Sequence, residues 1–212
     1  MKKIGVLLVD DHTVVRQGLR ALFKSNQGFD VVGEANNGRN AIELCNLTEP
    51  DVVVMDIRMP DLNGIDATRQ ILSAHPNTKV IALSAQSDHN TAREMIRAGA
   101  TGFILKDSAF EELIQAIGFI TAGKVYISPP LADAVRDAVD STETSAFTRL
   151  SPREREILQL FSEGKSTKEI ALHLKLSVKT VETHRRNVMA KTQASGIAEL
   201  TRYAIREGIS PP

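Results

Sequence analysis

The chain has 212 residues, of which 42% are hydrophobic and 25% are charged, the balance of an ordinary globular protein large enough for two small domains. Its apolar runs are far shorter than the roughly 20 residues that span a bilayer, and its first residues lack the apolar segment of a secretory signal. These features argue against a membrane-spanning or secreted protein, so we expect a cytoplasmic location and no membrane partner. The net charge of zero is unevenly distributed: residues 1–145 carry 14 basic and 19 acidic side chains, whereas residues 146–212 carry 12 and 7. The acidic part suits a cation site, and the basic part indicates a polyanionic partner.

The first part of the sequence alternates between candidate strands and candidate helices. Short runs of Val, Ile and Leu without alternating polar residues are typical of strands buried on both faces of a parallel sheet. Between them, apolar residues recur at three- and four-residue steps, which indicates helices. The predicted strands are residues 4–9, 30–34, 51–55, 79–83 and 102–105, and the predicted helices are residues 14–23, 39–47, 65–74, 91–98 and 110–121. This order predicts an α/β fold, a doubly wound sheet of five parallel strands.

The alternation stops after residue 124, where we place the end of the first domain. Residues 123–127 read as a turn, and Ser128-Pro129-Pro130 then resets the chain. A short helix is predicted over residues 131–139, and the polar, unpatterned residues 141–145 are typical of a linker. We therefore predict a first domain at 1–124, a linker at 125–147 and a second domain at 148–212.

The second domain is predicted to be small, all-α and built from four helices. Ser151-Pro152-Arg153-Glu154 combines an N-cap, a first-turn proline and a capping-box acid, and Ser166 and Ser177 occupy later N-cap positions. The predicted helices follow Ser151 up to Gly164, Ser166 up to about 174 and Ser177 up to about 191, with a last one over 197–206. The short turn at residues 175–177 predicts a helix-turn-helix arrangement.

Charged residues end three of the apolar runs in the predicted sheet. Asp10 and Asp11 follow the first strand, Asp56 follows the third and Lys106 follows the fifth. Because the carboxyl ends of parallel strands share one edge, where open sheets bind ligands, these charges are expected to form one small pocket. Three carboxylates so close repel one another, and Mg²⁺, which prefers oxygen ligands, removes that cost.

Asp56 is the predicted reactive group of this pocket. It stands alone at the end of the central strand, and a carboxylate can attack a phosphorus atom to form an acyl phosphate. Lys106 and the cation would neutralise charge on the transferring group. Ser84 ends a neighbouring apolar run and adds a hydroxyl to the same edge. The pocket therefore predicts chemistry on a phosphoryl group.

This pattern resembles the receiver domain of bacterial response regulators over about residues 3–122. The residues that carry the resemblance are Asp10-Asp11, Asp56, Met59-Pro60, Gly64, Ser84-Ala85, Phe103 and Lys106. The resemblance implies a flavodoxin-like fold, with Asp56 as the phosphoacceptor. It also implies a magnesium site formed by Asp10, Asp11, Asp56 and the backbone carbonyl of Arg58.

The resemblance further implies roles for three side chains around the phosphoryl group. Lys106 would hold the phosphoryl group, and Ser84 would turn inward to donate a hydrogen bond to it. Phe103 matches the aromatic switch position, which is often tyrosine in the family. Without a hydroxyl, Phe103 can report the inward state by packing but cannot donate a hydrogen bond.

The third helix of the second domain has the two faces that DNA reading requires. At about 100° per residue, Val181 and Val188 share one stripe, and a polar group lies opposite. That polar group consists of Lys179, Thr183, Arg186 and Asn187, with Glu182 at its edge. Arg186, Asn187 and Glu182 suit the edges of guanine, adenine and cytosine respectively.

Other polar residues of this region suit phosphates, which set register and give salt-dependent affinity. We assign this role to Lys168, Thr180 and Arg185. Arg185 projects toward the apolar stripe, so its aliphatic stem must run along that surface and carry the charge outward.

The second domain resembles the LuxR-type helix-turn-helix over about residues 148–207. The residues that carry the resemblance are the run 150–158, Glu169-Ile170-Ala171, Leu174, Ser177, Lys179-Thr180-Val181, His184 and Lys191. Joined to a receiver, this module is typical of NarL/FixJ-type response regulators. Thr192 and Gly196-Ile197 depart from the usual pattern and put the packing of the last helix in question.

The combined resemblance implies a transcription regulator and not an enzyme. Its implied partners are double-stranded DNA, a cognate sensor histidine kinase and a second copy of the chain when phosphorylated, with RNA polymerase as a further candidate. The last helix would supply the dimer contact through Leu200, Tyr203 and Ala204.

Two alternative functions are considered. The acidic cluster also suits a metal-dependent phosphohydrolase with an aspartyl-phosphate intermediate. Such an enzyme needs a second acid or base two residues beyond the nucleophile, and Arg58 at that position counts against it. The other alternative is an adaptor whose helix-turn-helix binds protein or RNA.

Overall fold

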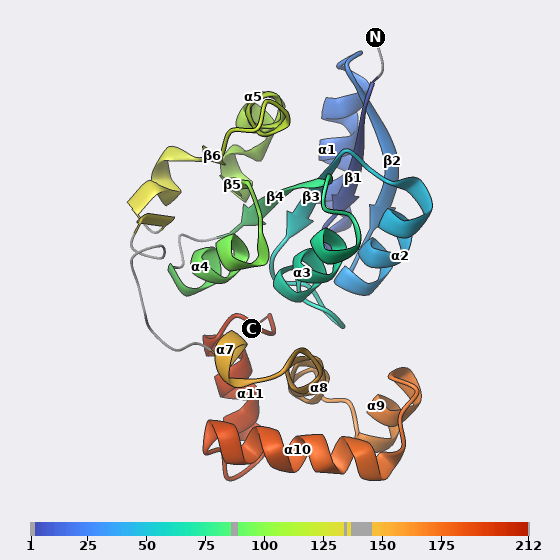
Figure 1. Cartoon of the computed structure of the whole chain (residues 1–212), viewed down its shortest axis with the longest axis vertical. Helices are drawn as coiled ribbons and strands as arrows, with labels where there is room; N and C mark the ends of the chain where they lie inside the picture. The colour runs from blue at the N-terminus through green and yellow to red at the C-terminus, as the bar shows by residue number, and fades with distance from the viewer. Residues whose placement is uncertain (1–2, 86–88, 134, 137–145, 212) are drawn as a thin grey trace. The chain divides into compact units, whose positions relative to one another are not determined.

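The computed structural model describes residues 3–85, 89–133, 135–136 and 146–211 (Figure 1). The chain divides into two compact units, and the division falls within residues 137–145. The predicted linker residues 141–145 and the end of the helix predicted over 131–139 lie outside the described residues. Residues 132, 133, 135 and 136 are helical. The domain boundaries at 124 and 147 stay predictions.

The first unit is built on a six-stranded parallel sheet with the order β2-β1-β3-β4-β5-β6. The strands are β1 Ile4–Val9, β2 Phe29–Ala35, β3 Val52–Asp56, β4 Lys79–Ser84, β5 Gly102–Leu105 and β6 Tyr126–Ile127. The first five confirm the prediction and form the doubly wound core. The short β6 was not predicted, since two residues carry no pattern. It pairs through Gly102 with Tyr126 and through Phe103 with Ile127.

Helices cover both faces of this sheet, as its continuous apolar strands require. The helices are α1 Thr13–Lys24, α2 Gly38–Thr48, α3 Gly64–Ala74, α4 His89–Ala98 and α5 Ala109–Thr121, with 3-10 turns η1 Lys106–Ser108 and η2 Pro129–Leu131. Helix α1 contacts α5, whereas α3 contacts both α2 and α4 (Figure 1). Between the strands and the α1–α5 layer lies a core that includes Leu8, Leu19, Phe23, Leu113 and Ile117. All five predicted helices are confirmed.

The second unit is helical and contains the four predicted helices and one more. Its helices are α7 Ala146–Arg149, α8 Pro152–Ser162, α9 Thr167–His173, α10 Val178–Thr192 and α11 Ile197–Arg206. Both capping boxes are formed, by Ser151 with Glu154 and by Ser166 with Glu169. Side chains of α8, α9 and α10 share one core, which includes Ile157, Leu160, Phe161, Ile170 and Val181. No helix in the described part of the chain has the length and hydropathy of a membrane span.

Two buried charged side chains of α8, Arg155 and Glu154, connect the helices of this unit. The Arg155 Nη1 atom donates to the carbonyls of Phe147, at 3.0 Å, and Leu150, at 2.6 Å. These bonds satisfy carbonyl groups at the end of α7, the helix that the sequence analysis missed because four residues show no helical period. The neighbouring Glu154 connects α8 to α10, since Lys191 Nζ lies 2.9 and 2.7 Å from its two carboxylate oxygens.

The atypical start of α11 is compensated locally. Gly196 has an extended backbone at the N-cap and cannot cap with a side chain. Glu199 instead accepts hydrogen bonds from the backbone N–H and the hydroxyl of Ser195, at 2.7 and 2.9 Å. Thr192, the other departure, donates its hydroxyl to the Val188 carbonyl at 2.8 Å. Helix α11 keeps its packing on α8.

Gly64→Ala is expected to destabilise the first unit by about 1–3 kcal/mol, the usual cost of overpacking. A Cβ at Gly64 would lie 2.1 Å from the backbone oxygen of Asp56, whereas at Gly118, within α5, nothing lies within 4 Å. Gly118→Ala is therefore the matched control, with an expected gain of about 0.5–1 kcal/mol. Urea unfolding followed by Tyr126 fluorescence in a Tyr203→Phe background measures both, since the chain has two tyrosines and no tryptophan. Equal effects of the two alanines would contradict the close contact.

The second unit is expected to lose stability at acid pH through Glu154. Burial raises the pKa of its carboxyl, but Lys191 and Ser151 outweigh burial and hold the pKa below its ordinary value of 4.5. The stabilisation is therefore present above pH 4.5 and is lost as the pH falls through the lower, folded-state pKa. In a Tyr126→Phe background, unfolding followed by Tyr203 fluorescence should weaken less steeply with acid in Glu154→Gln than in the parent. Parallel pH profiles would contradict the assignment.

Candidate functional site

Strand register brings the predicted acidic residues to one edge of the sheet. Val9 at the end of β1 pairs with Met55 of β3, and Asp56 pairs with Leu83 of β4. Ser84 in turn pairs with Leu105 of β5. The residues that follow these strand ends are therefore neighbours, although the sequence separates them widely.

Lys106 is the cation at the centre of this pocket. Its Nζ atom lies 2.7 Å from Asp56 Oδ2 and 2.8 Å from Asp10 Oδ2. Both aspartates are buried, with 4% and 1% of their surfaces exposed. This contact confirms that Asp10, Asp56 and Lys106 share one site.

The electrostatics of the pocket follow from burial and from the shortage of positive charge. Burial and the neighbouring Asp10 carboxylate raise the pKa of Asp56 to about 7, while Lys106 opposes the shift. Burial lowers the pKa of Lys106, but the Asp56 and Asp10 carboxylates outweigh it and leave that pKa raised. Desolvation and repulsion thus outweigh the lysine, so Asp56 keeps its proton to a higher pH than an ordinary aspartic acid, and Lys106 limits the size of this shift.

The residues present fit a divalent cation. One ligand atom from each of Asp10, Asp11, His12 and Asp56 lies within 4.8 Å of the others. Asp11 Oδ1 is buried and has no hydrogen bond of normal geometry to any described residue. Carboxylate oxygens that face one another in this way are suitable ligands for a hard cation.

His12 lies against the site, although the sequence analysis assigns it no role. Its backbone N–H donates to Asp10 Oδ1 at 2.8 Å. Its Nδ1 atom lies 3.2 Å from the same oxygen and 2.8 Å from Asp11 Oδ1. The signal available in the sequence was its position directly after Asp10-Asp11.

A tight loop follows Asp56 and leads into α3. The Gly64 N–H donates to the Ile57 carbonyl at 2.8 Å, so the loop closes on itself. Arg58, whose carbonyl is predicted to complete the cation site, lies in this loop, and its N–H lies 3.4 Å from Asp56 Oδ1. The ligand role of the Arg58 carbonyl stays a prediction.

Ser84 and Phe103 lie on neighbouring strands. Ser84 is half-buried at the end of β4, and Phe103 is buried in β5. Phe103 pairs with Ala82 on one side and with Ile127 of β6 on the other. Their roles in a phosphorylated state stay predictions.

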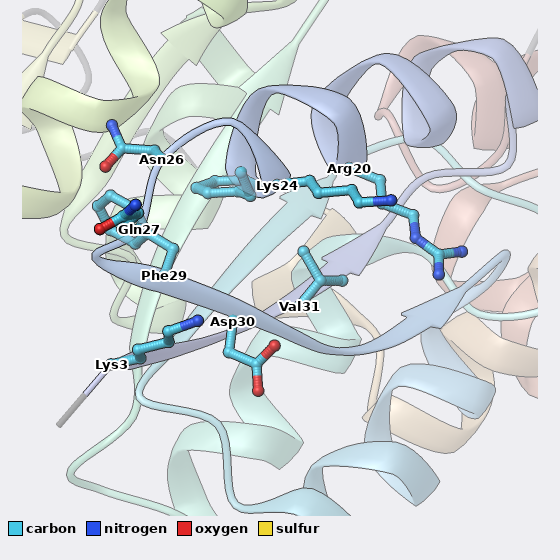
Figure 2. A pocket seen from close by; sticks show the side chains of 9 residues that line it. Lys3, Arg20, Lys24, Asn26, Gln27, Phe29, Asp30 and Val31 are labelled. Carbon is cyan, nitrogen blue, oxygen red and sulfur yellow. The ribbon is translucent and has the colours of Figure 1, made fainter.

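A separate cavity of about 300 Å³ lies where β1 and β2 begin, at the opposite edge of the sheet from the pocket (Figure 2). Phe23, Phe29 and Val31 give it apolar walls, and Lys3 and Lys24 lie around it. Its third cation, Arg20, is paired with Glu34 at 3.0 Å. The cavity therefore does not belong to the acidic site.

Helix α10 carries the predicted nucleic-acid face. Val181 and Val188 are buried, as predicted. The exposed residues of the polar face are Lys179, Glu182, Thr183, Arg186 and Asn187, joined by Lys168 on α9. The Arg185 guanidinium lies 5.3 Å from the centre of the Phe161 ring, which confirms that its stem follows the apolar surface.

Two hydroxyls of this face have partners within the helix. Thr180 Oγ1 lies 2.7 Å from the N-cap hydroxyl of Ser177, and Thr183 donates to the Lys179 carbonyl at 2.9 Å. Contact with a phosphate would have to compete with these bonds.

The predicted dimer contact through Leu200, Tyr203 and Ala204 stays a prediction. Leu200, Tyr203 and Ala204 are buried, and they lie on one face of α11, the helix that packs on α8. An apolar stripe on a terminal helix predicts burial equally well against its own domain or a partner, and here it forms part of the domain's own packing. Ile197, which is exposed, is an apolar residue of α11 left available.

Two substitutions are expected to move the pKa of Asp56 in opposite directions from its value of about 7. Lys106→Met removes the favourable cation and should raise this pKa, and Asp10→Asn removes a like charge and should lower it. Carboxyl ¹³C NMR titration in the presence of a metal chelator measures both. Shifts in the same direction would show that the three groups do not interact as the distances indicate.

Two family models match the chain. A model of the response regulator receiver domain matches residues 6–118, which include the whole acidic pocket. A model of bacterial regulatory proteins of the LuxR family matches residues 148–204, which include α8, α9 and α10. Proteins that combine these domains are DNA-binding transcription regulators and not enzymes.

Several known proteins resemble the chain along almost its whole length. The response regulator UvrY of Escherichia coli strain K12 is 36% identical over 208 residues, which are 97% of this chain and 95% of UvrY. GacA of Pseudomonas viridiflava is 36% identical over 208 residues, 97% of each chain. The structure of RcsB from Salmonella enterica serovar Typhimurium, bound to a promoter in the presence of the phosphomimetic BeF3⁻, is 25% identical with a TM-score of 0.61. It matches 99% of this chain and 100% of that one. The chain therefore belongs to the two-component response regulators of the NarL/FixJ type, in which a receiver domain is joined to a LuxR-type helix-turn-helix domain.

Proposed function

We propose that the chain is a cytoplasmic transcription regulator in which phosphorylation of Asp56 by a sensor histidine kinase alters dimerisation and promoter binding. The observation that carries the proposal is the buried Asp56 carboxylate at the end of the central strand, held by Lys106 at 2.7 Å beside Asp10. This is a carboxylate prepared to receive a phosphoryl group in a chain that also carries an exposed polar recognition helix.

The phosphorylation step follows from the chemistry of the pocket. A carboxylate oxygen of Asp56 forms a bond to the phosphorus of a phosphohistidine, and the phosphorus–nitrogen bond breaks. The nitrogen keeps the electron pair of that bond and takes a proton. Lys106, already against Asp56 Oδ2, neutralises charge on the transferred group, and the Ser84 hydroxyl donates to a phosphoryl oxygen.

Asp10, Asp11, Asp56 and the Arg58 carbonyl would hold Mg²⁺ in this site. When bound, the ion supplies positive charge that offsets the negative charge of the carboxylates and the phosphoryl group. Asp10 is held in place for this role by the His12 N–H at 2.8 Å. Arg16 Nη1 donates to the Asp10 carbonyl at 2.6 Å and holds the backbone of the same residue.

The polar face of α10 is proposed to enter the major groove. Arg186, Asn187 and Glu182 are exposed and suit base edges, whereas Lys168, Thr180 and Arg185 suit phosphates. Lys179 and Thr183 lie on the same exposed polar face. The solved complex of the similar protein RcsB with a promoter supports DNA as the partner. RNA polymerase is a further candidate partner.

The last helix, α11, is proposed to supply the dimer contact, with Leu200, Tyr203 and Ala204 as its candidate residues. These side chains are buried within the single chain, and Ile197 is an exposed apolar residue of the same helix. The phosphohydrolase alternative is wrong, since the chain belongs to a family of transcription regulators.

The test measures DNA affinity by gel shift with and without a small-molecule phosphodonor plus magnesium. Phosphodonor should increase the affinity of the wild type for promoter DNA and leave Asp56→Ala unchanged. Arg186→Ala should weaken binding by about 1–3 kcal/mol in both states, the usual value of a base contact. Arg136→Ala is the control, because it removes an equal charge from an exposed site in the first unit.

Two outcomes would contradict the proposal. Equal wild-type affinity in the two states would show that phosphorylation is not the switch. Loss of all binding to duplex promoter DNA by a folded chain would favour the adaptor that binds protein or RNA.

A further inference from the structure

The turn between α9 and α10 ends α9 with a Schellman motif. The Leu176 N–H donates to the Ala171 carbonyl at 2.8 Å. The Lys175 N–H donates to the Leu172 carbonyl at 3.2 Å, which completes the motif. Lys175 has a left-handed φ of +54° at the position that glycine usually takes, because a side chain is strained there. The turn that leads into α10 therefore has a conformation that lysine does not prefer, and contacts from outside the turn must hold it.

Arg153 of α8 supplies such a contact. The two bonds of the motif do not involve the carbonyl of the C-cap residue, Leu174, and Arg153 Nη2 donates to this carbonyl at 3.0 Å. The other terminal nitrogen of the guanidinium, Nη1, forms an ion pair with Glu156, one turn later on α8. Because the donors of a guanidinium lie in one rigid plane, the pair with Glu156 orients the donor that reaches Leu174.

The same turn of α8 also holds α10 close to its other end. Glu154, the residue after Arg153, binds Lys191 Nζ at 2.7 Å, and Lys191 is the last residue but one of α10. Helix α8 is thus connected to the chain just before α10, through Arg153, and to the last turn of α10, through Glu154. Two such points determine the direction of a helix.

We propose that Arg153 is a positioning residue for DNA recognition, which sets the direction of α10 and so aligns its base-reading side chains with the groove. Base contacts depend on this alignment more than phosphate contacts do. A base edge is read by donors and acceptors in fixed positions, whereas a phosphate attracts any cation nearby. Loss of Arg153 should therefore reduce affinity for a specific sequence and leave the general attraction to duplex DNA. The inference rests on the proposed role of α10.

The experiment measures binding of the full chain to two fluorescent duplexes over a range of salt concentrations, with phosphodonor and magnesium present. One duplex is selected by the wild-type chain from random sequences, and the other has an unrelated sequence. Arg153→Met removes the donors and keeps an apolar stem, and Arg153→Lys keeps one charged group. The Arg153 side chain is 33% exposed, so both variants are expected to fold.

Two further variants provide the comparisons. Arg202→Met is the matched control, since Arg202 is an exposed arginine of α11. Lys168→Ala removes a proposed phosphate contact. Far-UV circular dichroism checks that each variant is folded at the temperature of the measurement, and Arg153→Lys replaces Arg153→Met in the comparison if the latter is not folded.

Arg153→Met should weaken binding to the selected duplex at least about fivefold, the lower end of the loss of one base contact, and binding to the unrelated duplex by less than about twofold. The slope of log affinity against log salt concentration should stay as in wild type, whereas Lys168→Ala should reduce it by about one. Arg153→Lys should lose less than Arg153→Met, and Arg202→Met should match wild type. The Leu176 amide should exchange faster with solvent in Arg153→Met, because it belongs to the motif beside the lost bond.

Three results would overturn the inference. Wild-type affinity of Arg153→Met for the selected duplex would show that the contact with Leu174 does not align α10. A smaller salt slope would show that Arg153 binds a phosphate directly. Equal losses on both duplexes would show that the substitution only lowers the fraction of folded protein. If Lys168→Ala and Arg186→Ala also keep wild-type affinity, the proposed role of α10 fails, whereas if Arg153→Met alone keeps it, only the inference fails.

Discussion

The contact of Lys106 with Asp10 and Asp56 is the interaction on which the receiver depends. Two buried carboxylates side by side are unstable unless positive charge lies between them, and the lysine supplies it at 2.7 and 2.8 Å. Each of the three residues follows or ends a different strand. The two contacts of Lys106 therefore form only when β1, β3, β4 and β5 have the observed order and register. The same strand order and register therefore determine both the fold and the geometry of the reactive site.

The second unit uses buried charge for a different purpose. Arg155 connects α8 to the end of α7, and the Glu154–Lys191 pair connects α8 to α10. These contacts fix the helices that flank α8, while the polar face of α10 keeps its exposed side chains. Charged side chains thus stabilise the packing of α7, α8 and α10. The exposed charged side chains of α10 remain available to bind a ligand.

The sequence alone was sufficient to predict elements with a regular apolar pattern and the residues that directly follow such a pattern. Asp10, Asp56 and Lys106 were predictable because each follows a continuous apolar run, and α8 to α11 because their caps and apolar positions are regular. Strand β6 and helix α7 are too short to show a period, so only tertiary contacts reveal them. His12 was missed since no pattern states where the side chain of an N-cap residue points. Leu200, Tyr203 and Ala204 form an apolar stripe, and the sequence does not tell whether such a stripe meets its own domain or a second copy of the chain.

The loop between Asp56 and α3 has a mechanical consequence. With a backbone oxygen so close to Gly64 that no Cβ fits, the first turn of α3 rests directly on the main chain of Asp56. Repulsion at such a contact rises steeply, and close-packed interiors transmit strain instead of absorbing it. Asn63, buried at the N-cap of α3 and bonded to Asp66, ties the next residues to the same turn. A shift of the Asp56 main chain would therefore press directly on the first turn of α3, with little space between them to absorb it.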